Sequence, residues 1–307
     1  IIMTTRTLHV QVPATSANLG SGFDAVGIAL NYFNEIYFTE DDKEFISVEI
    51  EGLGKGEIPE TFADNMVGQA MERAAAYNGG SLPKGGAVKL VNRIPPGRGM
   101  GSSSSAIIGG ILIGDALTGS KMSREDMLSL ATEIEGHPDN VAPALLGGLT
   151  ISIMDGGQTM TNVVPVGDDL SFITVSPDVE VFTEDARAVL PKEIAYKDAV
   201  FNVSRVSFLV SSLVTKQYDR LQYGLQDKLH VPYRIGLIPG GESVLKAAED
   251  AGALGATISG SGSTLIAFAV ENEQAIMEAM MNEFKIRGID SEGHILKCWN
   301  EGAQILP

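Results

Sequence analysis

Residues 95–105 read Pro-Pro-Gly-Arg-Gly-Met-Gly-Ser-Ser-Ser-Ser, and this stretch carries the strongest structural signal in the chain. Its three alternating glycines allow left-handed backbone angles and a close approach of the main chain to a ligand. A strand pattern precedes it at residues 87–91, and a helix pattern follows it at residues 102–117. A flexible Gly/Ser turn is the alternative. Because amides at a helix start bind anions, the strand-loop-helix context favours a phosphate site.

The loop differs from the common nucleotide-binding motifs. No Gly-Lys-Ser/Thr follows its glycines, so it is not a Walker A loop. Residues 52–56 read Gly-Leu-Gly-Lys-Gly, but Gly56 stands where that motif has a hydroxyl, and a turn between strands is the simpler interpretation. Gly-x-Gly-x-x-Gly is missing, as are the His-Arg-Asp and Asp-Phe-Gly sequences of protein kinases. The pattern therefore predicts phosphate binding without a Walker lysine.

Composition narrows the class of protein further. The formal charge of −17 disfavours nucleic-acid binding, since phosphate backbones are held by clustered Lys and Arg. A phosphorylated ligand must instead be neutralised locally, by a metal and main-chain amides. No uncharged apolar stretch approaches the ~18 residues of a membrane span, and no secretory signal is visible. The single cysteine, Cys298, fits a reducing compartment, so we expect a cytoplasmic protein in which this thiol is structural. Ile1 and Ile2 are expected to precede the natural start.

The apolar periodicity predicts a mixed α+β protein of two domains. A length of 307 residues suggests two domains of roughly 150 residues each. Strands are expected at residues 7–12 (ending at Pro13), 34–51, 87–91, 149–153, 161–166, 171–176, 256–259, 264–270 and 293–299. Helices are expected at residues 64–77 (with Asp64 as N-cap), 102–117, 123–135, 184–190, 197–222, 241–251 and 273–287. The polar stretch 155–157 is the predicted boundary, which gives domains 1–156 and 157–307.

Three further segments accompany the loop. Residues 13–24 read Pro-Ala-Thr-Ser-Ala-Asn-Leu-Gly-Ser-Gly-Phe-Asp, residues 133–143 read Glu-Ile-Glu-Gly-His-Pro-Asp-Asn-Val-Ala-Pro, and residues 259–263 read Ser-Gly-Ser-Gly-Ser. The first and last alone would each be a tight turn. Together, and in this order, the segments resemble the GHMP kinases, a family of small-molecule kinases. Two departures from the family pattern are Ser263, where proline is common, and Ser105, where alanine often occurs.

The resemblance implies a two-domain α+β fold. Its N-terminal half would be similar to the second domain of ribosomal protein S5, and its C-terminal half would be ferredoxin-like. It implies ATP-dependent phosphorylation of an alcohol, closest to the family members that act on L-homoserine in threonine biosynthesis, and a homodimer.

The resemblance also implies a donor site for ATP and Mg²⁺. ATP would contact Asn65, Pro96, Gly97, Arg98, Gly99, Met100, Gly101, Ser102, Ser103, Ser104 and Ser105. Ser103 and Glu133 would hold Mg²⁺, which prefers oxygen ligands. A solvated helix face is the alternative for Glu133, and a helix-start position is the alternative for Asn65.

The acceptor site follows from the same resemblance. Arg187 and Arg234 would clamp the carboxylate of homoserine, which suits the guanidinium fork, and Thr183 would share a helix face with Arg187. The remaining contacts implied are Asn18, Asp24, His137, Asp139, Asn140 and Gly260. Asp24 would meet the ammonium and Asn140 the hydroxyl.

Catalysis is expected to depend on Asn140, Asp139 and Glu133. No lysine lies near residues 13–24 to pair with an aspartate base, so Asp139 and Asn140 are candidates for orienting the hydroxyl, and the existence of a general base stays open.

Two rival functions remain from the sequence. Another GHMP kinase, acting on mevalonate or a sugar, would share the phosphate loop. The arginine pair disfavours sugars, which offer no carboxylate, and mevalonate lacks the ammonium that Asp24 would recognise. A non-catalytic sensor with the same fold is the second rival, and the intact Ser103 and Glu133 argue against it. The sequence His137-Pro138-Asp139 also occurs in J-domain co-chaperones, but their short basic helical hairpin is absent here.

Overall fold

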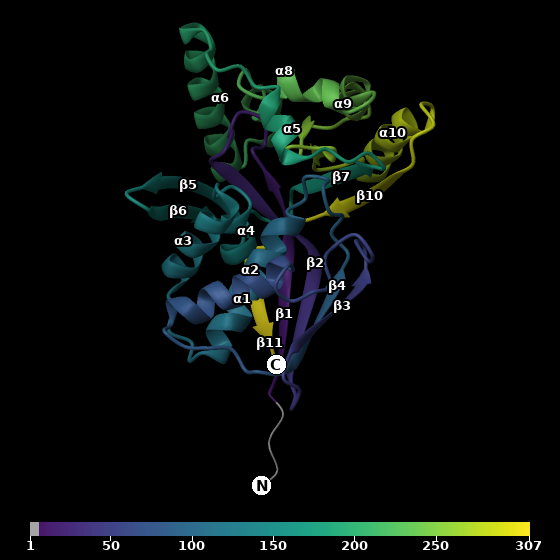
Figure 1. Ribbon diagram of the computed structural model, residues 1–307. Helices are drawn as coiled ribbons and strands as arrows, with labels where there is room; N and C mark the ends of the chain where they lie inside the picture. The colour runs from purple at the N-terminus through teal and green to yellow at the C-terminus, as the bar shows by residue number, and fades with distance from the viewer. Residues whose placement is uncertain (1–5) are drawn as a thin grey trace.

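The computed structural model describes residues 6–307, and Ile1 and Ile2 lie outside this range. The chain forms two β-sheets with their helices, one unit above the other in Figure 1. The predicted α+β architecture with two domains is confirmed.

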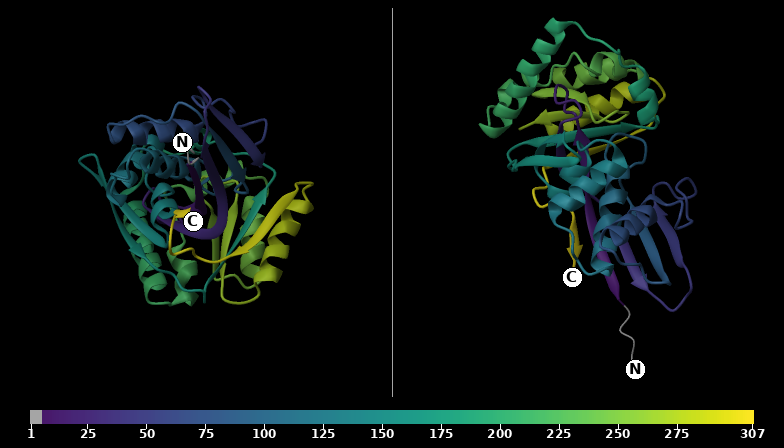
Figure 2. Two further views of the ribbon diagram at one scale, coloured as in Figure 1. Left: turned by 90° about the horizontal axis from the view of Figure 1, so that it is seen from below. Right: turned by 60° about the vertical axis from the view of Figure 1, so that its left-hand side comes forward.

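The first sheet has seven strands in the order β11-β1-β2-β4-β3, with β5 pairing to β2 and β6 to β5. Its strands are β1 (Thr7–Ala17), β2 (Val26–Glu40), β3 (Ile46–Gly52), β4 (Gly86–Asn92), β5 (Leu149–Asp155), β6 (Gln158–Val164) and β11 (Gln304–Leu306). Its helices are α1 (Met66–Tyr77), α2 (Ser102–Leu117), α3 (Arg124–Glu135) and α4 (Val141–Leu146). They gather on one side of the sheet, as the two views of Figure 2 show.

Helix α2 is held close to α1 by its own glycines. Side chains at Gly110 and Gly114 would overlap the backbone carbonyls of Val67 and Met71, so only glycine permits this approach. Most of α2 is buried, with Ile107, Ile108 and Ile111 in the same apolar cluster as strands β1, β2 and β4. This packing fixes the position of the α2 N-terminus, where the predicted phosphate loop ends.

The second sheet is antiparallel, with strand order β10-β7-β9-β8. Its strands are β7 (Ser171–Pro177), β8 (Gly255–Ile258), β9 (Leu265–Ala269) and β10 (Ser291–Leu296). The remaining helices are α5 (Thr183–Ala188), α6 (Tyr196–Val214), η1 (Tyr218–Arg220), α7 (Leu221–Gly224), α8 (Val231–Arg234), η2 (Ile235–Leu237), α9 (Gly241–Asp250) and α10 (Glu273–Lys285). With α9 and α10 packed on the sheet, the order strand-helix-strand-strand-helix-strand is ferredoxin-like.

The structure corrects four details of the predicted organisation. Residues 156–157 form the turn of the β5–β6 hairpin, so the first sheet extends past the predicted boundary, to Val164. The same sheet also includes the C-terminal strand β11, which pairs with β1. Strand β1 continues beyond Pro13. The register shifts between Pro13 and Ala14, and such a bulge tolerates proline, which has no N–H to donate to the neighbouring strand. Helix α6 ends at Val214, well before residue 222. Asn65, not Asp64, caps α1.

Candidate active site

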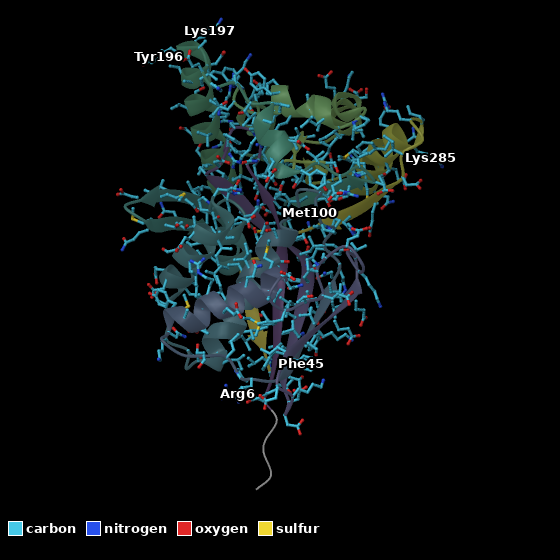
Figure 3. The ribbon with its side chains drawn as sticks, in the orientation of Figure 1. Arg6, Phe45, Met100, Tyr196, Lys197 and Lys285 are labelled. Carbon is cyan, nitrogen blue, oxygen red and sulfur yellow. The ribbon has the colours of Figure 1, made fainter. Side chains whose placement is uncertain are left out.

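The glycine loop lines a cleft between the two sheet units. Figure 3 labels Met100 of this loop at the junction of the two units. The cleft is lined by Asn18, Asp24, Pro95, Gly97, Gly99, Gly101, Ser102, Ser103, Glu135, His137, Asp139, Asn140, Val181, Thr183, Arg187, Arg234, Gly260 and Ser261. The sequence segments 13–24, 95–105, 133–143 and 259–263 therefore meet in one place.

The loop adopts the backbone that its glycines allow. Gly97, Gly99 and Gly101 have φ angles of 64°, 76° and 74°, in the left-handed region. Gly101 is the N-cap of α2, and no side chain caps the free amides of this helix start. A Cβ at Gly99 would overlap the carbonyl oxygen of Ser259, and one at Gly101 would overlap Thr15 Oγ1. The loop thus presents uncapped amides to the cleft while its other side is tightly packed.

Only part of the predicted loop faces the cleft. Arg98 points away and bonds Asp178 at 3.3 Å, on the rim of a neighbouring hollow that Pro96 also lines. Met100, Ser104 and Ser105 are buried. Any contact of these residues with a nucleotide must therefore come from the backbone.

The two serines that depart from the family pattern have structural partners. Ser105 Oγ accepts a hydrogen bond from the buried Asn34 Nδ2 at 3.0 Å. Asn34 Oδ1 in turn accepts from the amides of Arg93 and Ile94, just before the loop. Ser263 donates its hydroxyl to the carbonyl of Val179. Both serines thus stabilise the loops in which they lie.

The acidic residue beside the loop is Glu135, not the expected Glu133. Glu133 is exposed and pairs with Arg73 at 2.8 Å, on the solvated face of α3. Glu135, at the last residue of α3, accepts a hydrogen bond from Ser103 Oγ at 2.9 Å and lines the cleft. Burial raises the pKa of the Glu135 carboxyl, and the Ser103 bond opposes that rise.

One sequence signal could have found Glu135. It precedes Gly136, which ends α3 in the left-handed conformation with φ of 96°, so the chain turns there into the following segment. The expected role of Glu133 is not supported by its position.

Asp139 and Asn140 lie where the loop and the first strand meet. Asn140 Oδ1 accepts the Thr15 hydroxyl at 2.7 Å. Asp139 is 2% exposed and hydrogen-bonds His137 Nδ1. That bond raises the pKa of His137. One oxygen of the Asp139 carboxylate is therefore engaged by His137.

The acceptor end of the cleft carries an ion pair. Arg187 donates two hydrogen bonds to Asp24, at 3.1 and 2.9 Å, which raises the pKa of Arg187. Asn18 Oδ1 accepts a hydrogen bond from the backbone amide of Asp24 at 2.9 Å. Asn18 Nδ2 donates one to the carbonyl oxygen of Gly260 at 3.0 Å. Asn18 and Gly260 therefore fasten two glycine segments together. Thr183 begins α5 one turn before Arg187, as predicted from the spacing.

Arg234 is a buried cation at the same end. Its side chain is 2% exposed, and no ion pair found among residues 6–307 includes it. Nε donates to the carbonyl of Ala186 at 2.9 Å, and the guanidinium lies over the ring of Phe23. Burial lowers the pKa of Arg234, and Arg187 lowers it further. Sequence reasoning missed His230, which is fully buried. Its Nδ1 atom lies 3.4 Å from Nη1 of Arg234.

Asn65 lies outside the cleft. Its side chain accepts the amide of Val67 at 2.9 Å and donates to the carbonyl of Pro59 at 2.7 Å. It is 1% exposed. The helix-start alternative therefore explains the contacts of this carboxamide.

Comparisons with known proteins agree with this geometry. The family model described as GHMP kinases N terminal domain matches residues 65–148, and the one described as GHMP kinases C terminal matches residues 216–286. A homoserine kinase of Carboxydothermus hydrogenoformans is 43% identical over 284 residues, 92% of this chain and 91% of its own. One from Caldanaerobacter subterraneus is 41% identical over 300 residues, covering 97% and 95%.

Solved structures give the same picture. The crystal structure of homoserine kinase from Cytophaga hutchinsonii matches with a TM-score of 0.90 at 33% identity, covering 100% of this chain and 99% of its own. The mevalonate kinase of Methanococcus jannaschii has a TM-score of 0.69 at 14% identity over 96% and 99%, which shows a shared fold alone. Across residues 6–307, no helix is both long and apolar enough to cross a membrane.

Proposed function

The chain belongs to the GHMP kinase family, and from this premise we propose that it transfers the γ-phosphate of ATP to the hydroxyl of L-homoserine. The product would be O-phospho-L-homoserine, a step of threonine biosynthesis. The observation that carries the proposal is the buried Arg234 beside the Asp24–Arg187 pair, within one cleft that also contains the glycine loop.

The acceptor end matches the charges of homoserine. Its carboxylate would bind Arg234, which has a buried guanidinium and no carboxylate partner among the residues that the structure describes. Arg187 would share that carboxylate, and its present partner Asp24 would then meet the ammonium group. Mevalonate has a carboxylate but no ammonium, so Asp24 favours homoserine over this rival acceptor.

The donor end fits a nucleotide with Mg²⁺. The amides from Gly97 to Ser103 would bind the phosphates, since the helix start leaves them uncapped. Ser103 and Glu135 are oxygen donors 2.9 Å apart, the chemistry that Mg²⁺ prefers when it also keeps waters and phosphate oxygens. No group of three His, Cys, Asp or Glu side chains within residues 6–307 could hold a metal alone. We therefore assign the metal role to Glu135 instead of Glu133; the bound ion would neutralise phosphate charge.

The reaction needs positioning more than covalent help from the protein. The acceptor oxygen forms a bond to the γ-phosphorus while the bond from that phosphorus to the bridging oxygen breaks, and the electron pair leaves with ADP. The hydroxyl proton passes to an oxygen of the transferred phosphoryl group. Asn140 orients the acceptor hydroxyl, and Asp139 holds His137 beside it.

A substrate series tests this proposal. ADP release would be measured with L-homoserine, mevalonate and galactose side by side, and with two analogues of homoserine. The first, 4-hydroxybutanoate, lacks the ammonium, and the second, 3-aminopropan-1-ol, lacks the carboxylate. We expect turnover with L-homoserine and a weaker reaction with each analogue. Turnover with mevalonate or galactose alone would refute the assignment, and binding of ATP without turnover of any acceptor would favour the sensor.

We also propose that the chain is a homodimer in the cytoplasm, with helix α6 at its interface. Figure 1 shows α6 standing at the edge of the molecule with one side free. Its exposed residues beyond the first turn are all uncharged: Val200, Val203, Ser204, Ser207, Phe208, Ser211 and Val214. Charge depletion of this kind is typical of interface cores.

A second copy of the chain is the occupant that this face suits. The hydroxyls of Ser204, Ser207 and Ser211 bond carbonyls of their own helix, so they can be buried without losing partners. In an antiparallel pair, Val200 would face Ser211 and Val203 would face Phe208. Each valine would then pack against either a small side chain or a flat ring. Two chains that each carry a net charge of −17 repel each other, and an uncharged face on both chains reduces this repulsion at the contact.

Light scattering of the purified chain tests the dimer. Val203→Asp would place a charge in the contact and is expected to give monomers. Phe45→Asp is the matched control, because Phe45 is 61% exposed at the opposite end of the molecule in Figure 3. A monomeric unmodified chain, or a Val203→Asp dimer, would overturn the interface.

A further inference from the structure

Thr15 lies next to the cleft and contacts two of the segments that line it, the glycine loop and the segment that carries Asn140. It sits on β1, is fully buried and does not line the cleft. Its hydroxyl lies 2.7 Å from Asn140 Oδ1, and its amide donates to the carbonyl of Met100 at 3.1 Å. The hydroxyl also fills the space that a Cβ at Gly101 would need. One residue therefore touches the start of α2 and the side chain expected to meet the acceptor.

The Asn140 side chain does not cap the helix that it precedes. It is the N-cap of α4, a position where asparagine normally accepts an amide of the first turn. Here the side chain makes no capping hydrogen bond. Its Oδ1 atom turns back toward β1 and accepts the Thr15 hydroxyl instead. Local helix chemistry does not explain this orientation, whereas the cleft does.

The direction of the hydrogen bond fixes the chemistry that Asn140 presents. The Thr15 hydroxyl donates, so the oxygen end of the carboxamide is directed to β1. The amino end, Nδ2, is then the end that can donate toward a ligand. Without this hydroxyl, the Asn140 carboxamide would lose the side-chain hydrogen bond that holds it against β1. A carboxamide oxygen facing the acceptor would attract the hydroxyl proton and turn the acceptor oxygen away from the phosphorus.

We propose that Thr15 is a positioning residue of the transfer step: it directs Asn140 Nδ2 toward the acceptor hydroxyl and holds that amide in register with Gly101. The inference rests on the proposed function, since it needs a hydroxyl acceptor beside Asn140. Thr15 does not line the cleft, so its effect passes through Asn140.

Hydroxyl removal with the shape retained is the first test. Thr15→Val is expected to lower kcat with L-homoserine by about 10–100-fold, because small misplacement of reacting groups has effects of this size. The KM for ATP should change by less than about 2-fold, since the loop amides stay in place. Thr174→Val is the matched control: Thr174 is equally buried, its hydroxyl has no partner among the described residues, and it lies on β7 outside the cleft.

A second pair of variants covers the case in which valine disturbs folding. Thr15→Ser and Thr15→Ala both lose the methyl group and differ only in the hydroxyl. We expect Thr15→Ser to retain kcat within about 3-fold of the unmodified chain and Thr15→Ala to match Thr15→Val, in keeping with a contribution from the hydroxyl alone. Equal kcat for the serine and alanine variants would overturn the proposal.

A double-mutant cycle separates positioning from simple support of the fold. In an Asn140→Ala background, Thr15→Val should lower kcat by no more than about 2-fold, because the partner is already gone. A full, additive loss in that background would show that Thr15 acts elsewhere and would refute the inference.

The unmodified chain separates this test from that of the proposed function. If it forms no ADP with L-homoserine, the proposed function fails first. If it turns over and the Thr15 variants match it, only the role of Thr15 fails.

Discussion

The two ends of the cleft are built from different parts of the polypeptide. At the proposed donor end, one short loop presents main-chain amides, its glycines allow a close approach, and Ser103 and Glu135 add two side-chain oxygens. At the proposed acceptor end, Asp24, Arg187 and Arg234 supply charged side chains from distant parts of the chain. A backbone site should therefore fail when atoms are added, and a side-chain site should fail when charge is removed. The following changes test that contrast, from the largest expected effect to the smallest.

Gly101→Ala should have the largest effect. The new Cβ would meet Thr15 Oγ1 and would also be strained at a φ of 74°, so the start of α2 must move. We expect kcat/KM for ATP to fall by roughly 10³-fold, an effect measured by steady-state kinetics. Gly288→Ala is the matched control, because Gly288 has the same φ of 74° and open space around it. A similar loss in both variants would mean that strain alone, and not the close approach, explains the effect.

Glu135→Gln should come next. Loss of the carboxylate would weaken the metal contact and lower kcat by about 10²-fold, with a higher Mg²⁺ requirement in a titration. Glu133→Gln provides the comparison on the same helix, since Glu133 is exposed and pairs with Arg73. The assignment fails if Glu133→Gln is the more damaged variant.

The pH profile gives an independent check on Glu135. Burial raises its pKa in the folded chain, so the carboxylate becomes protonated at a higher pH than an ordinary glutamate on acidification. This direction holds for the metal-free chain, so it is tested by stability without Mg²⁺ and not by turnover, because a bound cation would lower the same pKa. The same shift means that the ionised form costs folding free energy above the folded-state pKa, and this cost vanishes below the unfolded value. Glu135→Gln should raise the melting temperature at neutral pH but not in acid, as calorimetry would measure.

Arg234→Ala should act on the acceptor alone. Removal of the buried guanidinium is expected to raise the KM for L-homoserine by about 10–100-fold, the size of a lost charge-assisted pair. The KM for ATP should stay within about 2-fold. Arg234→Lys keeps the charge but not the planar fork, and should recover only part of the loss. An equal rise in the KM for ATP would break the division between the two ends.

Arg98→Ala should have the smallest effect, although Arg98 lies within the glycine loop. Its side chain points to Asp178, away from the cleft, and only its backbone belongs to the donor site. We expect kcat and both KM values within about 3-fold of the unmodified chain, since the partner Asp178 is exposed and such an ion pair contributes little. A large loss of ATP affinity would show that the Arg98 side chain contributes to the donor end, contrary to its orientation.

The elements best predicted from the sequence are those with strong local signals. Helix α2 was predicted at its observed bounds, because its glycine loop and apolar run mark both ends. Helix α3 begins directly after Ser123, close to the predicted start, and Ser123 forms a capping box with Asp126. The β5–β6 turn was misassigned as a domain boundary, since Gly156-Gly157 is equally typical of a hairpin and a linker. Strand β11 was missed because three residues carry too little pattern.

By itself, the sequence determined the conformation of the glycine loop, because that conformation follows from glycines close together in the chain. It also supplied Arg187 and Arg234, through the family resemblance and not through any local rule. Tertiary structure alone decided that Glu135 faces Ser103 while Glu133 faces solvent, since both lie in the last turn of one helix and only packing sets which side is inward. It also decided that Thr15 meets Asn140, because contacts between residues far apart in the chain depend on how the sheet and helices close around them.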